Sequence, residues 1–172
     1  MYIENCPLPV IASIHGYCLG GSSSILSFFD FHISTKDSVF SIKEVDIGLT
    51  ADLGFIQKVV KQTGKEGLMR KLSYTGEQFL GDRAFSYNLV DQLCENKAEL
   101  EKETYKLAEE IAKKSPVVLW GIKRMFNFSR DNTTAANLDM VATLNSGLMQ
   151  GMEMTESISA VLEKRTTKFP KL

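Results

Sequence analysis

The most constraining feature of this sequence is a glycine-rich turn that separates a short apolar segment from an amphipathic one. Residues 10–14 are mostly apolar, residues 15–21 read HGYCLGG, and apolar side chains then recur at helical spacing through residue 29. Because glycine adopts backbone conformations closed to other residues, the pattern predicts a strand over residues 10–14, a turn, and a helix over residues 22–29. The first amides of a helix have no partner within it. We therefore expect the Gly21 amide to donate a hydrogen bond to an anion or a developing oxyanion.

The segments after the turn predict a mixture of short strands and longer helices. Strands are expected over residues 30–34, 38–42 and 89–93, and helices over residues 54–62, 65–72, 78–87, 98–113, 116–128, 133–149 and 155–164. The first strand, the helix and the next strand suit a right-handed βαβ unit. The fold class is therefore α/β, with a core in residues 1–95 and a helical region in residues 96–172.

Charge and cysteine content argue against several classes of function. A net charge of −1 gives no electrostatic basis for binding nucleic acid or an anionic membrane. The three cysteines, Cys6, Cys18 and Cys94, have no metal-ligand spacing, so neither a disulfide framework nor a metal site is expected. No apolar run approaches the length of a membrane span.

The turn also lacks the common nucleotide and nucleophile motifs. It contains neither GxxxxGK[ST] nor GxGxxG, and the serines at residues 22–24 do not stand in GxSxG. Two interpretations of the turn remain open, namely an anion site and tight packing between strand and helix. Ser22 is expected to cap the helix rather than to act as a nucleophile.

Residues 43–52 form a carboxylate-rich segment between a predicted strand and a predicted helix. Glu44 and Asp52 flank a patch of apolar side chains within it. An apolar pocket disfavours the charged form of a carboxylate, and two such groups could take a proton at one substrate carbon and return one at another. The alternative is a solvated surface loop. His15 and His32 are expected to be core or surface residues.

Two segments resemble a known family. Residues 9–21, PVIASIHGYCLGG, resemble the PVIAAVxGxxxGGG segment of the crotonase (enoyl-CoA hydratase/isomerase) superfamily. Residues 43–54, KEVDIGLTADLG, look like the KEVDxGLxADxG segment of Δ3,5-Δ2,4-dienoyl-CoA isomerases. The resemblance covers essentially the whole chain. It implies the C-terminal part of a crotonase-like ββα-spiral fold, followed by a helical trimerisation region that assembles homotrimers or homohexamers.

The resemblance implies a function on acyl-CoA thioesters that needs no metal or redox cofactor. The Gly21 amide would be one of two donors to the thioester oxygen and would stabilise an enolate. Glu44 and Asp52 would move protons as a 3,5-dienoyl-CoA becomes a 2,4-dienoyl-CoA in fatty-acid β-oxidation. The alternatives are a non-catalytic acyl-CoA-binding or scaffold paralogue and an enoyl-CoA hydratase.

The resemblance also implies which residues contact the substrate, and the sequence departs from the family at one of them. Leu19, Gly20 and Ser24 would line the acyl thioester, and Lys123 would contact the CoA moiety. Where Ser24 stands, dienoyl-CoA isomerases have an aspartate and hydratases a glutamate. Serine does no general acid or base chemistry at neutral pH, so this departure argues against hydration. Ser22 stands where the family has a third glycine.

The two ends of the chain give two further expectations. Family domains begin well before Pro9, so an N-terminal part with further strands and the second oxyanion donor is expected to be missing here. The last three residues, PKL, resemble a peroxisomal targeting tripeptide. The sequence therefore favours the peroxisome, with the mitochondrion as the alternative.

Overall fold

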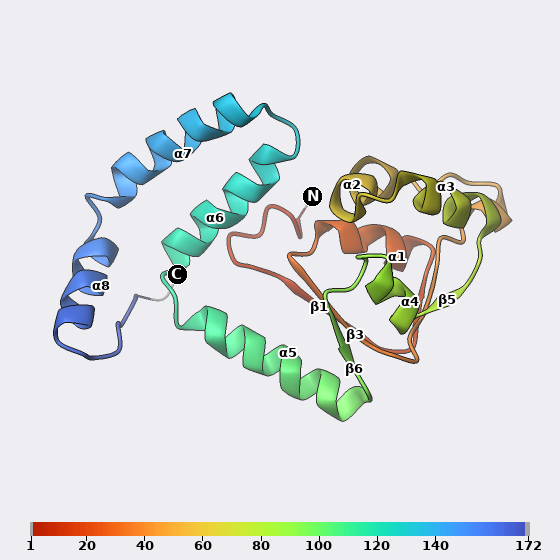
Figure 1. The fold of residues 1–172 in the computed structure, drawn as a ribbon, viewed down its shortest axis with the longest axis horizontal. Helices are drawn as coiled ribbons and strands as arrows, with labels where there is room; N and C mark the ends of the chain where they lie inside the picture. The colour runs from red at the N-terminus through yellow and green to blue at the C-terminus, as the bar shows by residue number, and fades with distance from the viewer. Residues whose placement is uncertain (1, 171–172) are drawn as a thin grey trace. The chain divides into compact units, whose positions relative to one another are not determined.

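Two small sheets organise the first of two compact units in the structure, a computed structural model that describes residues 2–170. This unit comprises Val10–Lys106 with the residues up to Glu4. One sheet has the order β1-β3-β6 and is parallel throughout, with strands β1 (Ile11–Ile14), β3 (Phe31–Thr35) and β6 (Gln92–Cys94) (Figure 1). The other has the order β2-β4-β5, with strands β2 (Tyr17–Leu19), β4 (Val39–Ser41) and β5 (Phe79–Leu80). In this second sheet β2 and β4 are parallel, and β4 and β5 are antiparallel.

The predicted βαβ unit is confirmed. Strand β1 pairs in parallel with β3, with Ile11 opposite Phe31. Helix α1 (Gly21–Ile25) and the 3-10 helix η1 (Leu26–Phe28) lie between them in the sequence. The strand expected over residues 89–93 is displaced to β6, which begins at Gln92.

The segment after β1 contains a strand where the sequence predicted only a turn. Gly16, with φ of 76°, follows β1, and β2 then pairs with β4 so that Cys18 lies opposite Phe40. Gly20, with φ of 53°, ends β2 and occupies the N-cap position of α1. The prediction that Ser22 caps the helix is therefore wrong. Ser22 lies inside the helix, and its hydroxyl donates to the Leu19 carbonyl at 2.8 Å.

The helices of the first unit follow the sequence pattern except at two places. The structure contains η2 (Glu44–Ile47), α2 (Phe55–Thr63), α3 (Glu66–Thr75) and α4 (Gly81–Ser86). The helix expected over residues 78–87 is partly wrong because Phe79 pairs with β4 and stacks on Phe40, with ring centroids 5.8 Å apart. The segment 43–52, expected to be a loop, contains the 3-10 turn η2.

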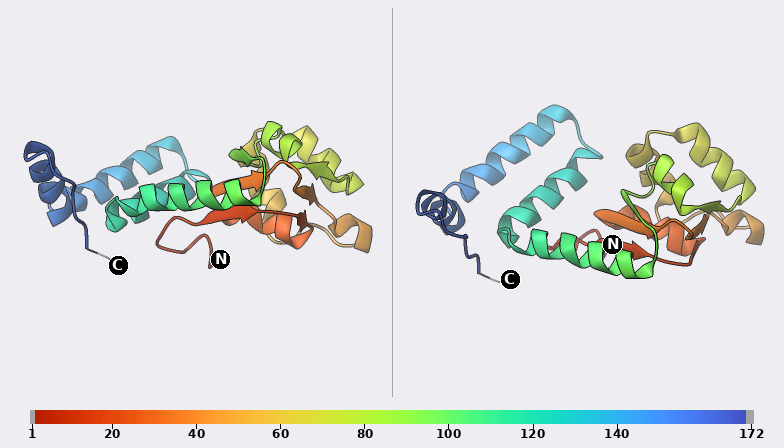
Figure 2. Two further views of the ribbon diagram at one scale, coloured as in Figure 1. Left: turned by 90° about the horizontal axis from the view of Figure 1, so that it is seen from below. Right: turned by 60° about the horizontal axis from the view of Figure 1, so that its bottom comes forward.

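The hydrophobic core of the first unit contains side chains from the second sheet, from β1 and from the helices α2 and α3. The buried faces of α2 and α3 present Phe55, Val59, Met69 and Leu72. Because Phe55 and Val59 are four residues apart, they lie on one face of α2. They share one cluster with Phe40 of β4, while α2 and α3 follow one another along one side of this unit (Figures 1 and 2).

The second compact unit consists mainly of helices. It comprises Asn5–Pro9 with the residues from Leu107 on. Helix α5 (Lys97–Ala112) leads the chain into it, and α6 (Pro116–Ser129), α7 (Thr134–Leu148) and α8 (Met152–Leu162) follow, with α6 packed on α7. The Ser115 hydroxyl accepts from the Val118 N–H at 3.3 Å and caps α6, with Pro116 in its first turn. Helix α8 begins three residues before the predicted start at residue 155.

The mixed α/β fold class predicted from the sequence is confirmed. Apart from Asn5–Pro9, the boundary between the two units lies between residues 106 and 107. The domain boundary expected between residues 95 and 96 stays a prediction. Within residues 2–170, no helix is both long and apolar enough to cross a membrane.

Candidate active site

Two short parallel strands bring the glycine turn and the carboxylate segment together. The β2–β4 ladder pairs Leu19 with Ser41, and the Gly20 N–H donates to the Ser41 carbonyl at 2.9 Å. Glu44 follows three residues after Ser41, so the ladder sets its side chain beside the turn. A Cβ atom built on Gly20 would lie 3.8 Å from both Cδ and Oε2 of Glu44.

The Glu44 side chain is buried, with 7% of its surface exposed. Its Oε1 accepts a hydrogen bond of 2.8 Å from the Ser24 hydroxyl. Its Oε2 is buried and has no hydrogen-bond partner among the described residues. A buried polar atom without a partner costs about 1–3 kcal/mol, so such an atom in a native protein calls for an explanation. A substrate proton or an ordered water at Oε2 provides one.

The Gly21 amide stands at the start of α1, one residue after Gly20, which lies beside this carboxylate. As the first residue of the helix, it finds no carbonyl acceptor within the helix. Gly21 is exposed, and Asp52 is exposed in the turn that leads to α2. A Cβ atom on Gly21 would meet Leu53 Cδ1 at 3.4 Å, so the turn that carries Asp52 packs on the start of α1. Gly54 in the same turn has φ of 87° and would clash with the Phe28 ring if it carried a Cβ.

Five of the seven residues named from the sequence thus share one neighbourhood: Leu19, Gly20, Gly21, Ser24 and Glu44. Asp52 approaches the same helix start through its neighbour Leu53. Lys123 belongs to the second unit, where it is 6% exposed and its ammonium group donates to the Leu8 carbonyl at 3.1 Å. Its contact with CoA stays a prediction.

Sequence reasoning missed the hydrogen bond between Ser24 and Glu44. The sequence suggested that Ser24 lines the substrate, but the structure places it at 0% exposure with its hydroxyl on the carboxylate. The two residues are 20 positions apart on different elements, and no local pattern links them. The one available signal was Gly20, whose turn conformation allows β2 to end beside the Glu44 segment.

Cys18 of the glycine turn is a buried thiol. Burial raises the pKa of the Cys18 thiol, although hydrogen bonds with Ser23 and Ser22 lower it in part. The thiol form therefore dominates at neutral pH, and it is a poor nucleophile. Across residues 2–170, no group of three His, Cys, Asp or Glu side chains is placed to hold a metal ion.

His32 has a structural role in the first unit. Its ring Nε2 lies 2.7 Å from the Leu26 carbonyl oxygen, and its Nδ1 lies 3.2 Å from Asp91 Oδ2. His15 is exposed, and its Nδ1 lies 3.4 Å from Thr35 Oγ1. Both histidines are therefore accounted for by contacts that lie outside the Glu44 neighbourhood.

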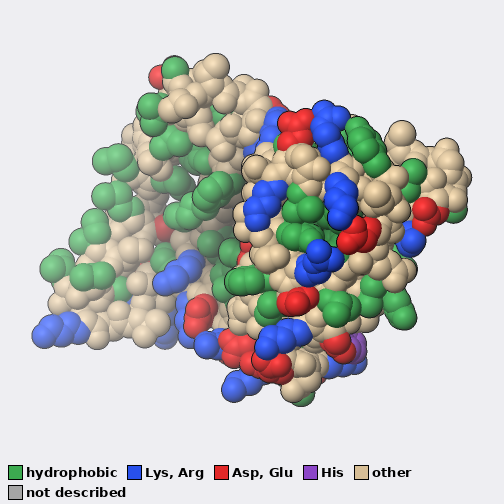
Figure 3. Space-filling model, turned by 45° about the vertical axis from the view of Figure 1, so that its right-hand side comes forward, with side chains coloured by type: hydrophobic (Ala, Val, Ile, Leu, Met, Phe, Trp, Pro, Cys, Tyr) green, Lys and Arg blue, Asp and Glu red, His purple; other side chains and the backbone are tan. Residues whose placement is uncertain are grey.

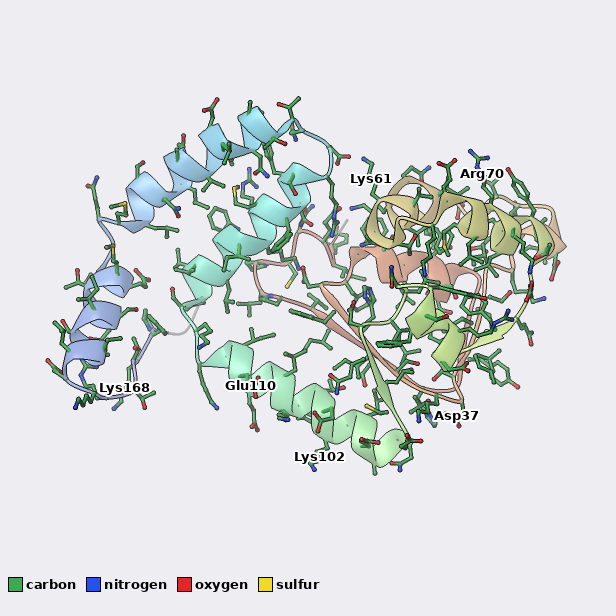
Figure 4. The ribbon with its side chains drawn as sticks, in the orientation of Figure 1. Asp37, Lys61, Arg70, Lys102, Glu110 and Lys168 are labelled. Carbon is green, nitrogen blue, oxygen red and sulfur yellow. The ribbon has the colours of Figure 1, made fainter. Side chains whose placement is uncertain are left out.

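A separate groove of about 440 Å³ lies between α2 and α3. Its lining is largely apolar, and it includes Lys61 and Arg70, whose side chains project from the two helices in Figure 4. Neither Glu44 nor Gly21 lines it. Figure 3 shows basic and acidic side chains interspersed on the face of the first unit that is turned to the viewer. That face presents no field of a single sign that would attract a polyanion.

Comparisons with known proteins identify the family to which the chain belongs. The family model of enoyl-CoA hydratase/isomerase matches residues 1–171. A Mus musculus protein named mitochondrial Delta(3,5)-Delta(2,4)-dienoyl-CoA isomerase is 39% identical over 166 residues, which cover 96% of this chain and 51% of the mouse protein. An Arabidopsis thaliana protein named peroxisomal Delta(3,5)-Delta(2,4)-dienoyl-CoA isomerase is 38% identical over 170 residues, which cover 99% of this chain and 61% of that protein.

A solved structure gives the same result for the fold. The crystal structure of an enoyl-CoA hydratase from Bacillus anthracis matches with a TM-score of 0.91 and 26% identity, over 97% of this chain and 64% of that one. The chain spans about half the length of the mouse relative that it matches. Together with the α/β architecture described above, these matches show that the chain belongs to the enoyl-CoA hydratase/isomerase (crotonase) family.

Proposed function

We propose that this chain carries the acid–base residues of an isomerase that converts 3,5-dienoyl-CoA to 2,4-dienoyl-CoA in fatty-acid β-oxidation. The observation that carries the proposal is the buried Glu44 carboxylate, whose Oε2 has no partner among the described residues and lies beside the glycine turn. The relatives named dienoyl-CoA isomerases support the choice of substrate class.

The proposed reaction moves two double bonds without changing the composition of the substrate. One proton leaves C2 of the acyl chain, the electrons shift along the conjugated system, and one proton is added at C6. Glu44 and Asp52 are the two carboxylates proposed to accept and supply these protons. The N–H of Gly21, an exposed residue, is proposed to bind the thioester oxygen as negative charge develops on it. Because no electrons are gained or lost overall, this chemistry needs no redox cofactor.

The proposal is tested by adding 3,5-dienoyl-CoA to the purified protein and following the absorbance of the conjugated 2,4-product. A full-length form of the protein, which also supplies the second oxyanion donor, is expected to turn the substrate over. Glu44→Gln and Asp52→Asn are each expected to lower kcat by about 10²–10⁴-fold, as for loss of a general acid or base. Glu66→Gln, which removes an exposed carboxylate of α3, is the matched control and is expected to leave the rate unchanged.

Two other outcomes would replace this proposal. Binding of acyl-CoA without turnover would indicate a non-catalytic acyl-CoA-binding protein. Addition of water to a 2-enoyl-CoA would indicate a hydratase, and it would have to occur without a second acid at position 24. Equal rates in the unmodified chain and in the Glu44→Gln and Asp52→Asn variants would exclude these carboxylates from the reaction.

We also propose that the chain self-associates as a trimer or a pair of trimers through the helices of the second unit. Large apolar side chains are exposed on α6 and α8, including Trp120, Ile122, Phe126, Met154 and Ile158. A groove of about 310 Å³ between α6 and α7 adds to this apolar surface. Light scattering after gel filtration tests the proposal, and a monomer at micromolar concentration would contradict it.

For the cellular location we propose the peroxisome, with the mitochondrion as the alternative. The support is that one relative is named peroxisomal and another mitochondrial. The terminal residues Lys171 and Leu172, on which the sequence argument depends, lie outside the described residues. Imaging of a fluorescent protein fused to the N-terminus tests the proposal, because this fusion leaves the last three residues available. Cytosolic fluorescence of this fusion would contradict the peroxisomal location.

A further inference from the structure

We propose that Ser24 is a positioning residue for Glu44. Its hydroxyl holds one oxygen of the carboxylate and leaves the other oxygen as the atom that exchanges the proton. This inference rests on the proposed function. It goes further by giving the two oxygens of Glu44 different tasks, and by giving a task to a buried side chain that stands where the family has an acid.

The contact between the two side chains has a defined direction. Ser24 Oγ and Glu44 Oε1 are 2.8 Å apart, and Ser24 has no exposed surface. An ionised carboxylate has only acceptor sites, so the serine must be the donor. A hydrogen bond to a charged acceptor is roughly twice as strong as one between neutral groups. The carboxylate is therefore held at Oε1 by a donor that water cannot easily replace.

The donor itself is fixed by the start of α1. The Gly20 N–H binds the Ser41 carbonyl at 2.9 Å, and the Ser23 hydroxyl binds the Cys18 carbonyl, so the helix is attached to β4 and to β2. One side-chain torsion places the hydroxyl oxygen of a serine, whereas three torsions place the carboxylate oxygens of a glutamate. A short, anchored donor can therefore restrict a longer and more flexible acceptor, which is what a precisely placed acid or base requires.

The second oxygen of Glu44 is buried and lies beside the glycine turn. Glu44 Oε2 has no hydrogen-bond partner among the described residues. A Cβ atom on Gly20 would lie 3.8 Å from it, in van der Waals contact, so an alanine at that position would occupy the space beside the oxygen. Because Gly20 has no side chain, the position beside Oε2 that a Cβ atom would take is the place where we expect a substrate atom to approach.

A serine at this position also differs chemically from an acid. Two carboxyl groups at hydrogen-bond distance cannot both ionise easily, and they share one proton. A hydroxyl donates its hydrogen bond without carrying a charge. With Ser24 as its partner, the Glu44 carboxylate accepts its hydrogen bond from a group that carries no charge, and it has no second acid at position 24 with which to share a proton.

The kinetic test compares two buried serines of the same helical segment. Ser24→Ala removes the donor to Glu44. Ser27→Ala removes a hydroxyl that instead donates to the Ser24 backbone carbonyl at 3.1 Å, and Ser27 is 3% exposed. With 3,5-dienoyl-CoA as substrate, Ser24→Ala is expected to lower kcat by about 10- to 100-fold with little change in KM, because misplacement of a reacting group has effects of this size. Ser27→Ala is expected to retain nearly the full kcat.

A spectroscopic test does not depend on turnover. The chain is labelled with glutamate that carries ¹³C at the side-chain carboxyl, and the Glu44 resonance is identified by its loss in Glu44→Gln. Ser24→Ala is expected to move this resonance, whereas Ser27→Ala is expected to leave it in place. Circular dichroism establishes that each variant is folded.

The outcomes separate this inference from the proposed function. If the full-length form of the protein does not convert dienoyl-CoA, the proposed function fails, and the carboxyl resonance alone decides whether Ser24 holds Glu44. A Glu44 resonance that is the same in Ser24→Ala and in the unmodified chain would overturn the inference. Equal losses of kcat in Ser24→Ala and Ser27→Ala would also overturn it, since a merely structural role affects both variants alike.

Discussion

Leu53 lies over Gly21 at the start of helix α1, where a Cβ atom added to the glycine would stand 3.4 Å from Leu53 Cδ1. This separation is at the edge of ordinary van der Waals contact, so a small side chain fits after a minor adjustment of the leucine. The backbone N–H of Gly21, rather than its lack of a side chain, is the group that the proposed function requires. The two properties can therefore be separated by substitution.

Gly21→Pro and Gly21→Ala form a matched pair. Both add a Cβ atom toward Leu53, but only proline removes the N–H, and proline is well tolerated at the first position of a helix. We expect Gly21→Pro to lower kcat by about 10²–10³-fold, the effect of losing one oxyanion donor, and Gly21→Ala to remain close to the unmodified chain. Similar rates for the two variants in the dienoyl-CoA assay would show that the amide is not an oxyanion donor.

The close approach of Gly81 to β3 predicts a loss of stability. A Cβ atom on Gly81 would lie 2.3 Å from the Thr35 carbonyl oxygen and 3.1 Å from that of Lys36, both backbone atoms that cannot rotate away. We expect Gly81→Ala to lower the free energy of unfolding by about 1–3 kcal/mol or more, as overpacking does. Urea denaturation measures the change.

Gly67 of α3 is the control for this substitution. A Cβ atom at Gly67 would meet no heavy atom within 4 Å among its surroundings. Because alanine also restricts the unfolded chain, Gly67→Ala is expected to raise the free energy of unfolding by about 0.4–1 kcal/mol. Opposite signs at the two positions are the expected result, and a loss of stability at both would contradict the reasoning.

The lowered pKa of Asp91 leads to a prediction of how the stability of the fold depends on pH. Burial alone would raise the pKa of Asp91, but the hydrogen bonds from the side chain and backbone of His32, together with the charge of its ring, hold the pKa below its ordinary value. A carboxylate whose pKa is lowered by folding contributes stability that is fully present above its unfolded pKa of about 3.9. That contribution is lost as the pH falls through the lowered, folded value.

We expect Asp91→Asn to reduce the dependence of the unfolding free energy on pH below about pH 4, the region set by the ordinary aspartate pKa. The effect should be modest because the Asp91 side chain is 56% exposed, and solvent screens its interaction with His32. Thermal melts between pH 2 and pH 7 measure the difference. Glu109→Gln, which removes an exposed carboxylate of α5, should leave the pH dependence as it is in the unmodified chain.

The exposed side chain of Phe126 provides a test of the proposed self-association through the helical unit. It lines the groove between α6 and α7, and 69% of its surface is exposed. If this surface joins copies of the chain, Phe126→Asp should reduce the particle mass in light scattering while the helix content measured by circular dichroism stays the same. Tyr105→Asp changes an aromatic side chain of similar exposure on α5 and should leave the mass unchanged.

Much of the fold could be predicted from the sequence where several signals agree. The apolar run before the glycines and the short segment after the predicted helix identified β1 and β3, and the helix between them indicated a crossover, so the parallel pairing followed. Ser115 and Pro116 together located the start of α6 to the residue. These features are determined by residues that lie close together in the sequence, so the sequence alone is enough to predict them.

The parts that could not be predicted depend on contacts between distant segments. Strand β2 is only three residues long and lies between two glycines. Its extended conformation therefore depends on its pairing with β4 and not on the strand propensity of its own residues. The β5 residue Phe79 was assigned to a helix because nothing nearby reveals that it stacks on Phe40. In the site, residue types pointed to Glu44, but the hydrogen bond from Ser24 depends on the packing of α1 against the η2 segment.

The buried pair of Ser24 and Glu44 also bears on how selection acts on this chain. Folding gains little from a carboxylate that is removed from water while one of its oxygens lacks a partner, and replacing both members of such a polar pair by apolar groups is often neutral or stabilising. The double variant Ser24→Ala with Glu44→Met should therefore unfold at an equal or higher temperature than the unmodified chain, although it has lost the proposed base. If so, selection retains a glutamate at position 44 for its role in the reaction, although this residue lowers the thermal stability of the fold.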